Sequence, residues 1–317
     1  MTVLRQRPLM TVDVFTSVPY RGNPLAVVLD GTGLDDAQMQ AFAAWTNLSE
    51  TTFVLPPTAA GRAAGADYRV RIFTPGGELP FAGHPTLGSC HAWLAQGGVP
   101  QRADRIVQEC AKGLVAITRH ADGAGERLAF AAPATAISAV EPELQAQVAQ
   151  ALGVSEDQVL RAAWLDNGPR WMGVLLDEPD TVLSLTPDHA RLKALNVKAG
   201  VCALYPAEEA PALIGRSSRE ARAFATGLRA SSEPTGPQLE VRGFAAPTGV
   251  HEDPVTGSLN ASLALWLREN GLLRAPYLAN QGCCVGRDGQ VHISEDEQKQ
   301  LWVGGHTVTC IQGQVLL

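Results

Sequence analysis

The sequence predicts an α+β protein built from two similar domains. Two observations carry this prediction. Strand-like and helix-like segments do not alternate regularly along the chain, which argues against a doubly wound parallel sheet. An offset of 174 residues also aligns GELPFAGHP at 77–85 with HEDPVTGSL at 251–259. Each of these segments follows an alternating strand and runs into an apolar helix, so an internal duplication explains the match better than chance does.

Three features of the sequence predict the elements of the first half: the alternation of polar and apolar residues, the positions of prolines, and the charge of the helix ends. Polar and apolar residues alternate in the strands, and prolines end them. Acidic residues suit the positive end of the first helix, which should stop near Asn47, so that Glu50 lies at a helix-to-strand junction. In chain order, we expect two strands within 10–29, a helix over 34–48, strands over 50–57 and 67–75, a helix over 85–97, and three short strands between 105 and 130.

A small-residue, proline-marked stretch at 131–140 predicts the boundary between the domains. The predicted domains are residues 1–133 and 134–317, and residues 306–317 are candidates to pack with the first domain. The second half repeats the mixture of elements. We expect a helix near 141–152, strands near 171–176 and 200–205, the alternating strand QLEVRGFAAP at 238–247, a helix over about 258–269, and further strands to the C-terminus.

Composition narrows the class of protein. Of 317 residues, 45% are apolar and 18% are charged, as in an ordinary soluble globular protein. The net charge of −7 and the absence of a Lys/Arg cluster argue against nucleic acid and anionic membranes as partners. No signal-peptide or membrane-spanning apolar run occurs, so we expect a cytoplasmic protein. Most of the six cysteines should be buried thiols, and Cys283 and Cys284, taken as strand neighbours, should point to opposite faces.

The two aligned segments predict an anion site. If the two domains face one another, two glycine-led helix N-termini, at Gly83 and Gly257, point into one cleft. Free backbone N–H groups and the helix dipole favour a carboxylate or a phosphate there, and glycine lets the ligand approach the backbone closely. His84 and Ser258 then occupy equivalent positions. The alternative is that both glycines are ordinary helix starts.

Each half also offers an acidic residue near this cleft. Glu50 follows Ser49 in NLSETTF, and Asp253 lies in EDP, four residues before Gly257. An acid at a helix end is usually a cap or a solvated charge, and for Glu50 alone that interpretation is the stronger one. The residues by themselves therefore leave the role of both acids open.

Five segments, in order, resemble the PhzF-like family of phenazine-biosynthesis isomerases, within the diaminopimelate epimerase-like fold superfamily. They are DVFTSVPYRGNPLAVV, NLSETTFV, RIFTPGGELPFAGHPTLG, HEDPVTGS and QGCCVGR. The resemblance implies two similar α+β domains, each a sheet wrapped around a central helix, with the active site in the cleft between them. It also implies a homodimer.

The resemblance assigns roles to the cleft residues. Glu50 corresponds to the general acid/base of the family, and His84 and Asp253 correspond to its other catalytic groups. Gly83, His84, Asp253, Gly257 and Ser258 would bind the substrate carboxylate and its neighbouring groups.

Racemases of the superfamily use paired cysteines, and this chain has Ala82 and Thr256 in those places. Two-base racemisation through thiolates is therefore not expected. Cys90 should belong to the core. The segment VTGSL also differs from the ATGSA of the isomerase, so Leu259 and Asn260 are expected to alter the pocket.

The function expected from these residues is that of a cofactor-independent isomerase. Burial should raise the pKa of Glu50 toward neutrality, so that it can take a proton from a small carboxylate-bearing substrate, such as trans-2,3-dihydro-3-hydroxyanthranilate or a related compound, and return it elsewhere. No metal-ligand spacing, GxSxG elbow or nucleotide-binding motif appears, so no metal or cofactor is expected. The remaining alternative is a non-catalytic protein that binds small carboxylates in the same cleft.

Overall fold

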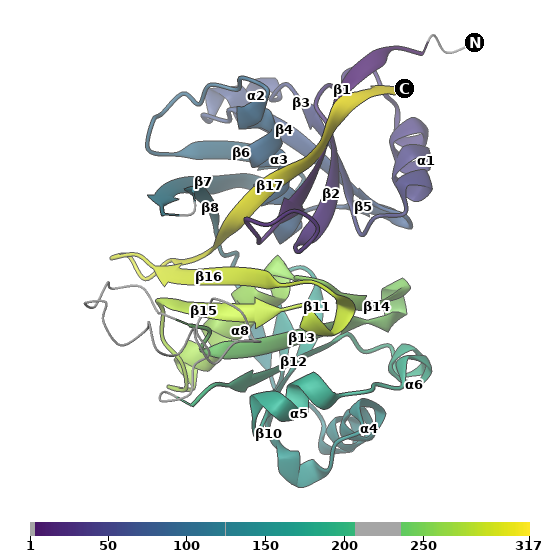
Figure 1. Cartoon of the computed structure of the whole chain (residues 1–317), viewed down its shortest axis with the longest axis vertical. Coiled ribbons are helices and arrows are strands. Elements are labelled where there is room, and N and C mark those ends of the chain that lie inside the picture. Colours follow the sequence, from purple (N-terminus) through teal and green to yellow (C-terminus); the bar gives the residue numbers. More distant parts are fainter. Residues whose placement is uncertain (1–3, 124, 207–235) are drawn as a thin grey trace.

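Two strand-rich halves lie end to end along the long axis of the molecule, and each wraps strands around one central helix (Figure 1). The computed structural model describes residues 4–123, 125–206 and 236–317. The central helices are Gly83–Ala95 (α3) and Gly257–Glu269 (α8), each of 13 residues and displaced from one another by the predicted offset. The predicted α+β fold with a helix at the centre of each sheet is confirmed.

The first half contains every strand and helix that the sequence predicted there. Its first helix begins with a capping box at Asp35 and ends at Asn47, whose φ of 54° lies in the left-handed region. The elements are Gln6–Val14 (β1), Asn23–Val28 (β2), Asp36–Thr46 (α1), Thr51–Leu55 (β3), Ala59–Ala63 (α2), Tyr68–Thr74 (β4), Gly77–Leu79 (β5), α3, Ile106–Cys110 (β6), Gly113–Asp122 (β7) and Gly125–Ala131 (β8).

The second half contains the predicted elements and several more. They are Ala136–Ser138 (β9), Pro142–Leu152 (α4), Glu156–Gln158 (η1), Val159–Asp166 (β10), Arg170–Leu176 (β11), Pro179–Ser184 (α5), His189–Ala194 (α6), Ala199–Leu204 (β12), Leu239–Ala245 (β13), Ala246–Thr248 (η3), Val250–Asp253 (β14), α8, Tyr277–Gln281 (β15), Cys283–Val285 (η4), Gly289–Glu295 (β16) and Leu301–Leu316 (β17). The sequence did not predict β10, α5 or α6, because charged and small residues interrupt the alternation in β10 and both helices have only six residues.

Strand pairing repeats between the halves. In the first half β1 pairs with β2 antiparallel, β2 with β3 parallel, β3 with β4 antiparallel and β4 with β6 parallel. In the second half the same directions recur for β10 with β11, β11 with β12, β12 with β13 and β13 with β15. The internal repeat expected from the 174-residue offset is therefore present in the topology.

The last strand belongs to both halves. The first part of β17, residues 301–306, pairs with β16 on one side and with β8 on the other. Residues 307–316 pair antiparallel with β1, so the C-terminal end of the chain completes the first sheet (Figure 1). A strand of 16 residues thus ties the halves together by backbone hydrogen bonds.

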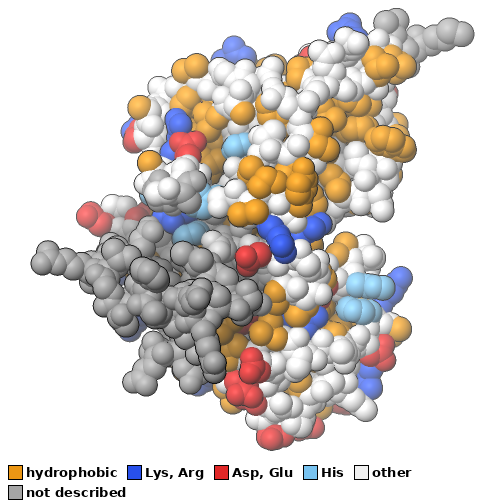
Figure 2. Space-filling view, in the orientation of Figure 1, with side chains coloured by type: hydrophobic (Ala, Val, Ile, Leu, Met, Phe, Trp, Pro, Cys, Tyr) orange, Lys and Arg blue, Asp and Glu red, His pale blue; other side chains and the backbone are white. Residues whose placement is uncertain are grey.

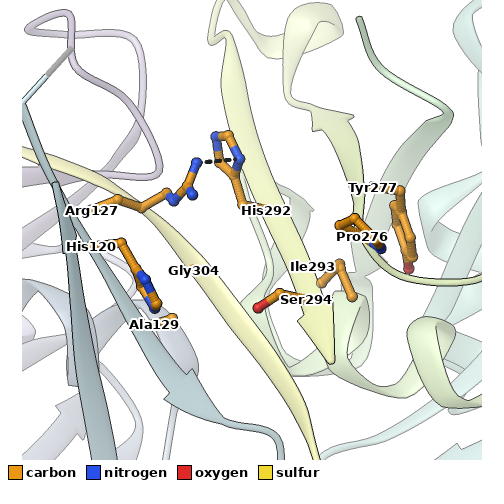
Figure 3. A pocket seen from close by; sticks show the side chains of 9 residues that line it. All are labelled: His120, Arg127, Ala129, Pro276, Tyr277, His292, Ile293, Ser294 and Gly304. Carbon is orange, nitrogen blue, oxygen red and sulfur yellow. Dashed lines mark hydrogen bonds between the residues drawn. The ribbon is translucent and has the colours of Figure 1, made fainter. Parts of the chain in front are cut away.

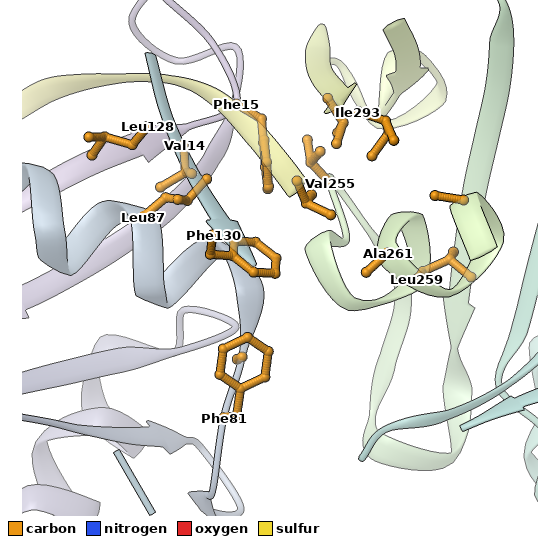
Figure 4. Close-up of a cluster of buried hydrophobic side chains, with 14 of the residues drawn as sticks. Val14, Phe15, Phe81, Leu87, Leu128, Phe130, Val255, Leu259, Ala261 and Ile293 are labelled. Atoms are coloured by element: carbon orange, nitrogen blue, oxygen red, sulfur yellow. The ribbon is translucent and has the colours of Figure 1, made fainter. Parts of the chain in front are cut away.

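An apolar cluster continues across the boundary between the halves (Figure 4). Phe81 and Phe130 from the first half meet edge to face, with ring centroids 5.6 Å apart. Val255 and Leu259 of the second half belong to the same cluster and are fully buried. The relative position of the halves is thus fixed by shared apolar burial as well as by β17.

One assumption about local structure was wrong. Cys283 and Cys284 were taken as neighbours in a strand, but they lie in the short helix η4, with their Sγ atoms 3.8 Å apart. Gly282 and Gly286 on either side have φ values of 105° and 73°, which are accessible to glycine and end the preceding strand at Gln281. Both cysteines are free thiols.

The repeat also preserves one ion pair. Arg71 binds Glu78 through Nε–Oε1 and Nη2–Oε2 contacts of 2.7 and 2.6 Å. Arg242 binds Glu252 through the same atoms at 3.0 and 2.8 Å. The second pair is more deeply buried, since its side chains are 6% and 7% exposed, whereas Glu78 is 35% exposed.

This difference in burial predicts unequal losses of stability. Arg242→Met should reduce the free energy of unfolding by about 3–5 kcal/mol, because it leaves the Glu252 carboxylate buried and unpaired. Arg71→Met should reduce the free energy of unfolding by only about 1 kcal/mol, because water can solvate the Glu78 carboxylate. Urea unfolding of both variants beside the wild type tests this. Equal losses would mean that burial does not govern the strength of the repeated pair.

Candidate active site

The structure brings Glu50, His84 and Asp253 together where the two halves meet. Glu50 lies between α1 and β3, His84 is the second residue of α3, and Asp253 is the last residue of β14. The Oε2 atom of Glu50 is 3.5 Å from Nε2 of His84. Asp253 is close enough for its charge to raise the pKa of Glu50. The surface is indented where the halves meet (Figure 2).

His84 is held as a neutral imidazole. Its ring forms a hydrogen bond with the backbone of Pro24, and because proline has no N–H, the carbonyl must accept it. Burial lowers the pKa of His84 to about 3. Its Nε2 atom, which faces Glu50, is buried without a hydrogen-bond partner. The ring therefore presents a hydrogen-bond acceptor to the site.

Glu50 and Asp253 are both mostly buried carboxyl groups, and their pKa values differ. Burial and the charge of Asp253 raise the pKa of Glu50 to about 8. Burial raises the pKa of Asp253 only to about 6, since hydrogen bonds from Thr256 and Asn23 favour its charged form. At pH 7 Asp253 is mostly ionised and Glu50 is mostly protonated. The upward pKa shift expected for Glu50 is confirmed.

Asp253 is fixed by residues from both halves. Asn23, the first residue of β2, donates to its Oδ1 atom at 2.9 Å, and Thr256 donates to Oδ2 at 2.7 Å. Asn23 also donates to the carbonyl of Val255 at 2.9 Å. The side chain of Gln281 donates to the Asp253 carbonyl and to Thr256. This network keeps both carboxylate oxygens oriented toward fixed donors.

The sequence did not single out Asn23 or Gln281 as parts of the site. Both lie in segments that carry the family resemblance, Asn23 in RGNP and Gln281 at the start of QGCCVGR. Asn260 donates from Nδ2 to the carbonyl of Thr256 at 3.0 Å and to Oε1 of Gln281 at 2.9 Å, so it supports both of these site residues. Leu259 is fully buried and contacts Gly200, and its effect on the pocket stays a prediction.

The N-termini of the two central helices touch. A methyl group placed on Gly83 would lie 2.9 Å from the Cα atom of Gly257, so neither position has room for a side chain. The residues before them, Ala82 and Thr256, provide no side-chain hydrogen bond to cap either helix. The first N–H groups of both helices therefore lack a capping side chain, as an anion-binding helix pair requires. Ser258 follows at the start of α8 and is buried.

No thiol lies at either helix start. Ala82 carries only a methyl group, and the hydroxyl of Thr256 is committed to Asp253. Cys90 is fully buried in the apolar core, as expected, and burial raises its pKa to about 12. Among these residues, the carboxyl group of Glu50 is the candidate for a base.

A separate pocket of about 200 Å³ lies between β8, β16 and β17 (Figure 3). His120, Arg127 and His292 line it, and Nη1 of Arg127 contacts Nδ1 of His292 at 2.8 Å. Arginine stays charged, so it donates and this nitrogen of His292 accepts. Neither Glu50 nor Asp253 lines this pocket, which places it outside the candidate site.

Two features are absent from the described part of the chain. No group of three or more His, Cys, Asp or Glu side chains is arranged to hold a metal ion. Among the described helices, none is long and apolar enough to cross a membrane.

Fold and site together define a protein of two similar lobes that brings two carboxyl groups and a histidine together where the lobes meet. Two comparisons of structure agree with this fold. A PhzF-family phenazine biosynthesis protein from Bacillus anthracis has a TM-score of 0.78 at 21% identity, covering 99% of this chain and 100% of that one. A probable proline racemase from Agrobacterium radiobacter has a TM-score of 0.57 at 14% identity, covering 98% and 92%.

Sequence comparison identifies the family. The model of the "Phenazine biosynthesis-like protein" family matches residues 12–313. The trans-2,3-dihydro-3-hydroxyanthranilate isomerase of Pseudomonas fluorescens is 33% identical, over 96% of this chain and 98% of that protein. "Antisense-enhancing sequence 1" of Schizosaccharomyces pombe is 33% identical over 96% of both chains. The chain therefore belongs to the PhzF family of phenazine biosynthesis-like proteins, and it is an enzyme of the isomerase class.

Proposed function

We propose that this chain is a cofactor-independent isomerase that moves one proton between two carbons of a small carboxylate-bearing substrate. One observation carries the proposal. Glu50 Oε2 and His84 Nε2 are buried, lack hydrogen-bond partners and lie 3.5 Å apart. Leaving two buried polar atoms without hydrogen-bond partners is unfavourable for the free energy of the folded state. A substrate that forms hydrogen bonds with both atoms would remove this unfavourable contribution.

Glu50 acts as base and then as acid. Its carboxylate takes a proton from a carbon next to a conjugated system, and the electron pair left on the substrate is delocalised over that system. The carboxyl group then returns the same proton to another carbon, so that Glu50 ends the cycle ionised. With a pKa of about 8, Glu50 is a much stronger base than an exposed glutamate.

The other groups position the substrate. His84, being neutral, accepts a hydrogen bond from a substrate hydroxyl or amino group. Asp253, ionised at neutral pH and held by Asn23 and Thr256, binds a second such donor. The helix starts at Gly83 and Gly257, with Ser258, bind the substrate carboxylate through backbone N–H groups. These groups define an amino or hydroxy carboxylate as the substrate class.

The relatives suggest one compound to test first. Two relatives, from Pseudomonas fluorescens and Pseudomonas chlororaphis, are named for trans-2,3-dihydro-3-hydroxyanthranilate. This compound has a carboxylate, an amino group, a hydroxyl group and a conjugated ring, one for each part of the proposed site. We propose it, or a close analogue, as the substrate.

Incubation of the protein with this compound in heavy water tests the proposal. We expect isomerisation, with deuterium found by NMR only at the carbon that receives the proton. Direct return of the substrate proton would lower the deuterium content below one atom per product molecule without changing that position. If the compound and its analogues bind but neither isomerise nor exchange, the protein is a carboxylate-binding protein and the proposed activity is wrong.

The pH dependence of the rate reports the state of Glu50. The base must be ionised in the free enzyme, and at pH 7 a group with a pKa of about 8 is only about one-tenth ionised. We therefore expect kcat/KM to rise nearly tenfold per pH unit between about pH 6 and 7, more steeply below pH 6, where Asp253 also becomes protonated, and to level off above about pH 8. A rate that falls over this range would mean that protonation by Glu50 comes first.

The proposal extends to assembly and location. Following the family resemblance, we propose a homodimer that works in the cytoplasm on a small carboxylate, without nucleic-acid or membrane partners. Size-exclusion chromatography with light scattering measures the mass in solution. A mass equal to the 33.5 kDa of one chain would exclude the dimer.

A further inference from the structure

The internal repeat gives Glu50 a counterpart in the second half. In the first half, Thr51 pairs with Phe73 across β3 and β4. In the second half, Ala199 pairs with Phe244 across β12 and β13. Each phenylalanine lies two residues after the arginine of the repeated ion pair, so the two registers correspond. The residue directly before Ala199 is Lys198, which therefore occupies the position of Glu50.

The side chain of Lys198 lies on the face of its sheet that covers α8. Two residues further along the same strand, Gly200 packs against Leu259 of α8. In the first half the corresponding residue, Thr52, accepts a hydrogen bond from Ser89 of α3. Because side chains two apart in a strand share a face, Glu50 and Lys198 are both on the inner face of their sheets, toward the start of the central helix.

Lys198 packs on a buried tryptophan. Its Nζ atom is 5.3 Å from the ring centroid of Trp171, on the neighbouring strand β11. Burial lowers the pKa of Lys198, and the charge of Asp166 opposes this shift. Trp171 is 3% exposed, yet its indole Nε1 has no hydrogen-bond partner. A buried indole N–H normally has a hydrogen-bond partner, and this one is able to donate to a bound acceptor.

A second unpartnered atom lies beside the first turn of α8. Asn167 donates from Nδ2 to the carbonyl of Ser258 at 2.9 Å, while its Oδ1 atom is buried without a partner. The residue is 3% exposed. The side chains of Trp171 and Lys198, which lie together, offer hydrogen-bond donors, and the side chain of Asn167 offers an acceptor beside the first turn of α8.

We propose that Lys198, Trp171 and the first turn of α8 form a cationic subsite that binds the carboxylate of the substrate, while Asn167 accepts a hydrogen bond from an adjacent amino or hydroxyl group. The inference takes its substrate class from the proposed function and extends it. The first half supplies the acid/base group, and the repeated position in the second half supplies the charge that anchors the anion. A lysine on a flexible stem acts here as a point charge for the carboxylate.

Binding of anthranilate and of its neutral analogue anthranilamide tests the subsite without requiring turnover. Isothermal titration of the wild type should show anthranilate binding more tightly than anthranilamide. Lys198→Met keeps the length of the side chain and removes the charge. We expect it to bind anthranilate about 10- to 100-fold more weakly, with little change for anthranilamide. Trp171→Phe should weaken anthranilate binding several-fold.

The matched control is Lys193→Met, an exposed lysine of α6 in the same half, which should bind both compounds as the wild type does. Equal binding of the two compounds by the wild type would overturn the subsite, and so would unchanged anthranilate binding by Lys198→Met. If the proposed function is wrong but the subsite is right, the results differ. Anthranilate binding would still depend on Lys198, while no proton transfer would be seen in heavy water.

Discussion

Glu50→Gln is expected to slow isomerisation and deuterium transfer by about 100- to 10,000-fold, the usual contribution of one positioned acid/base group. The amide has nearly the shape of a protonated carboxyl group but cannot take a proton from carbon. The substrate KM should change little, because the helix starts and Asp253 remain in place. Glu297→Gln, an exposed glutamate in the turn before β17, is the matched control and should keep full activity. Proton transfer that survives in Glu50→Gln would show that another residue is the base.

The same substitution is expected to stabilise the protein at high pH. The pKa of Glu50 is about 8 in the folded chain and near 4.5 when unfolded, so between these values the folded state binds more protons than the unfolded state. The free energy of unfolding of the wild type therefore falls as pH rises from about 4.5 to 8. The amide side chain of the variant carries no charge that must be buried. Its free energy of unfolding therefore does not fall in this way as the pH rises.

Thermal unfolding at two pH values measures this effect. At pH 9 Glu50→Gln should unfold about 5–10 °C above the wild type, and at pH 4.5 at nearly the same temperature. An equal difference at both pH values would mean that the gain comes from packing, and no gain at pH 9 would mean that Glu50 is solvated. A residue that destabilises the fold and is required for activity has been kept for its chemistry.

Helices and strands with strong patterns could be predicted from the sequence. The central helices start at a glycine after an extended residue, and the alternating strands before them end in turns, so a local pattern fixes both elements. The strand β10 could not be predicted, because Arg161 and two alanines hide its alternation, and only its partners on both sides keep it extended. The turn at Cys283 depends on two glycines with positive φ, which a sequence pattern does not distinguish from a strand with glycines.

The acid and histidine of the candidate site could be predicted, but the residues that control them could not. The motifs of Glu50 and His84, NLSE and GHP, resemble segments of the family, whereas position at the end of an element left the role of Glu50 open. Asn23 is 230 residues away from the carboxylate that it binds, and only the folded topology brings them together. Lys198 is harder still, since its correspondence with Glu50 rests on strand register and not on any shared motif. Residues that reach the site only through long-range strand pairing therefore cannot be predicted from local sequence patterns.

Gly83→Ala is expected to disrupt the site by separating the two helices that form it. The added methyl group would lie 2.9 Å from the Cα atom of Gly257 and 3.0 Å from the ring of Phe130, and the first of these neighbours is backbone that cannot rotate away. Overpacking of this kind costs about 1–3 kcal/mol of stability. The larger effect should be on activity, because a displacement of roughly 1 Å in substrate-positioning groups can cost about 100-fold in rate.

Gly77→Ala is the matched control, at the first residue of β5, where a methyl group would meet no atom within 4 Å. Activity measured well below the unfolding temperature of both variants separates positioning from stability. A Gly83→Ala variant that unfolds earlier but keeps its rate would show that the contact serves only packing. Loss of rate in the folded variant, with the control unaffected, would show that the contact of the two helix starts sets the distance between the carboxylate-binding N–H groups and Glu50.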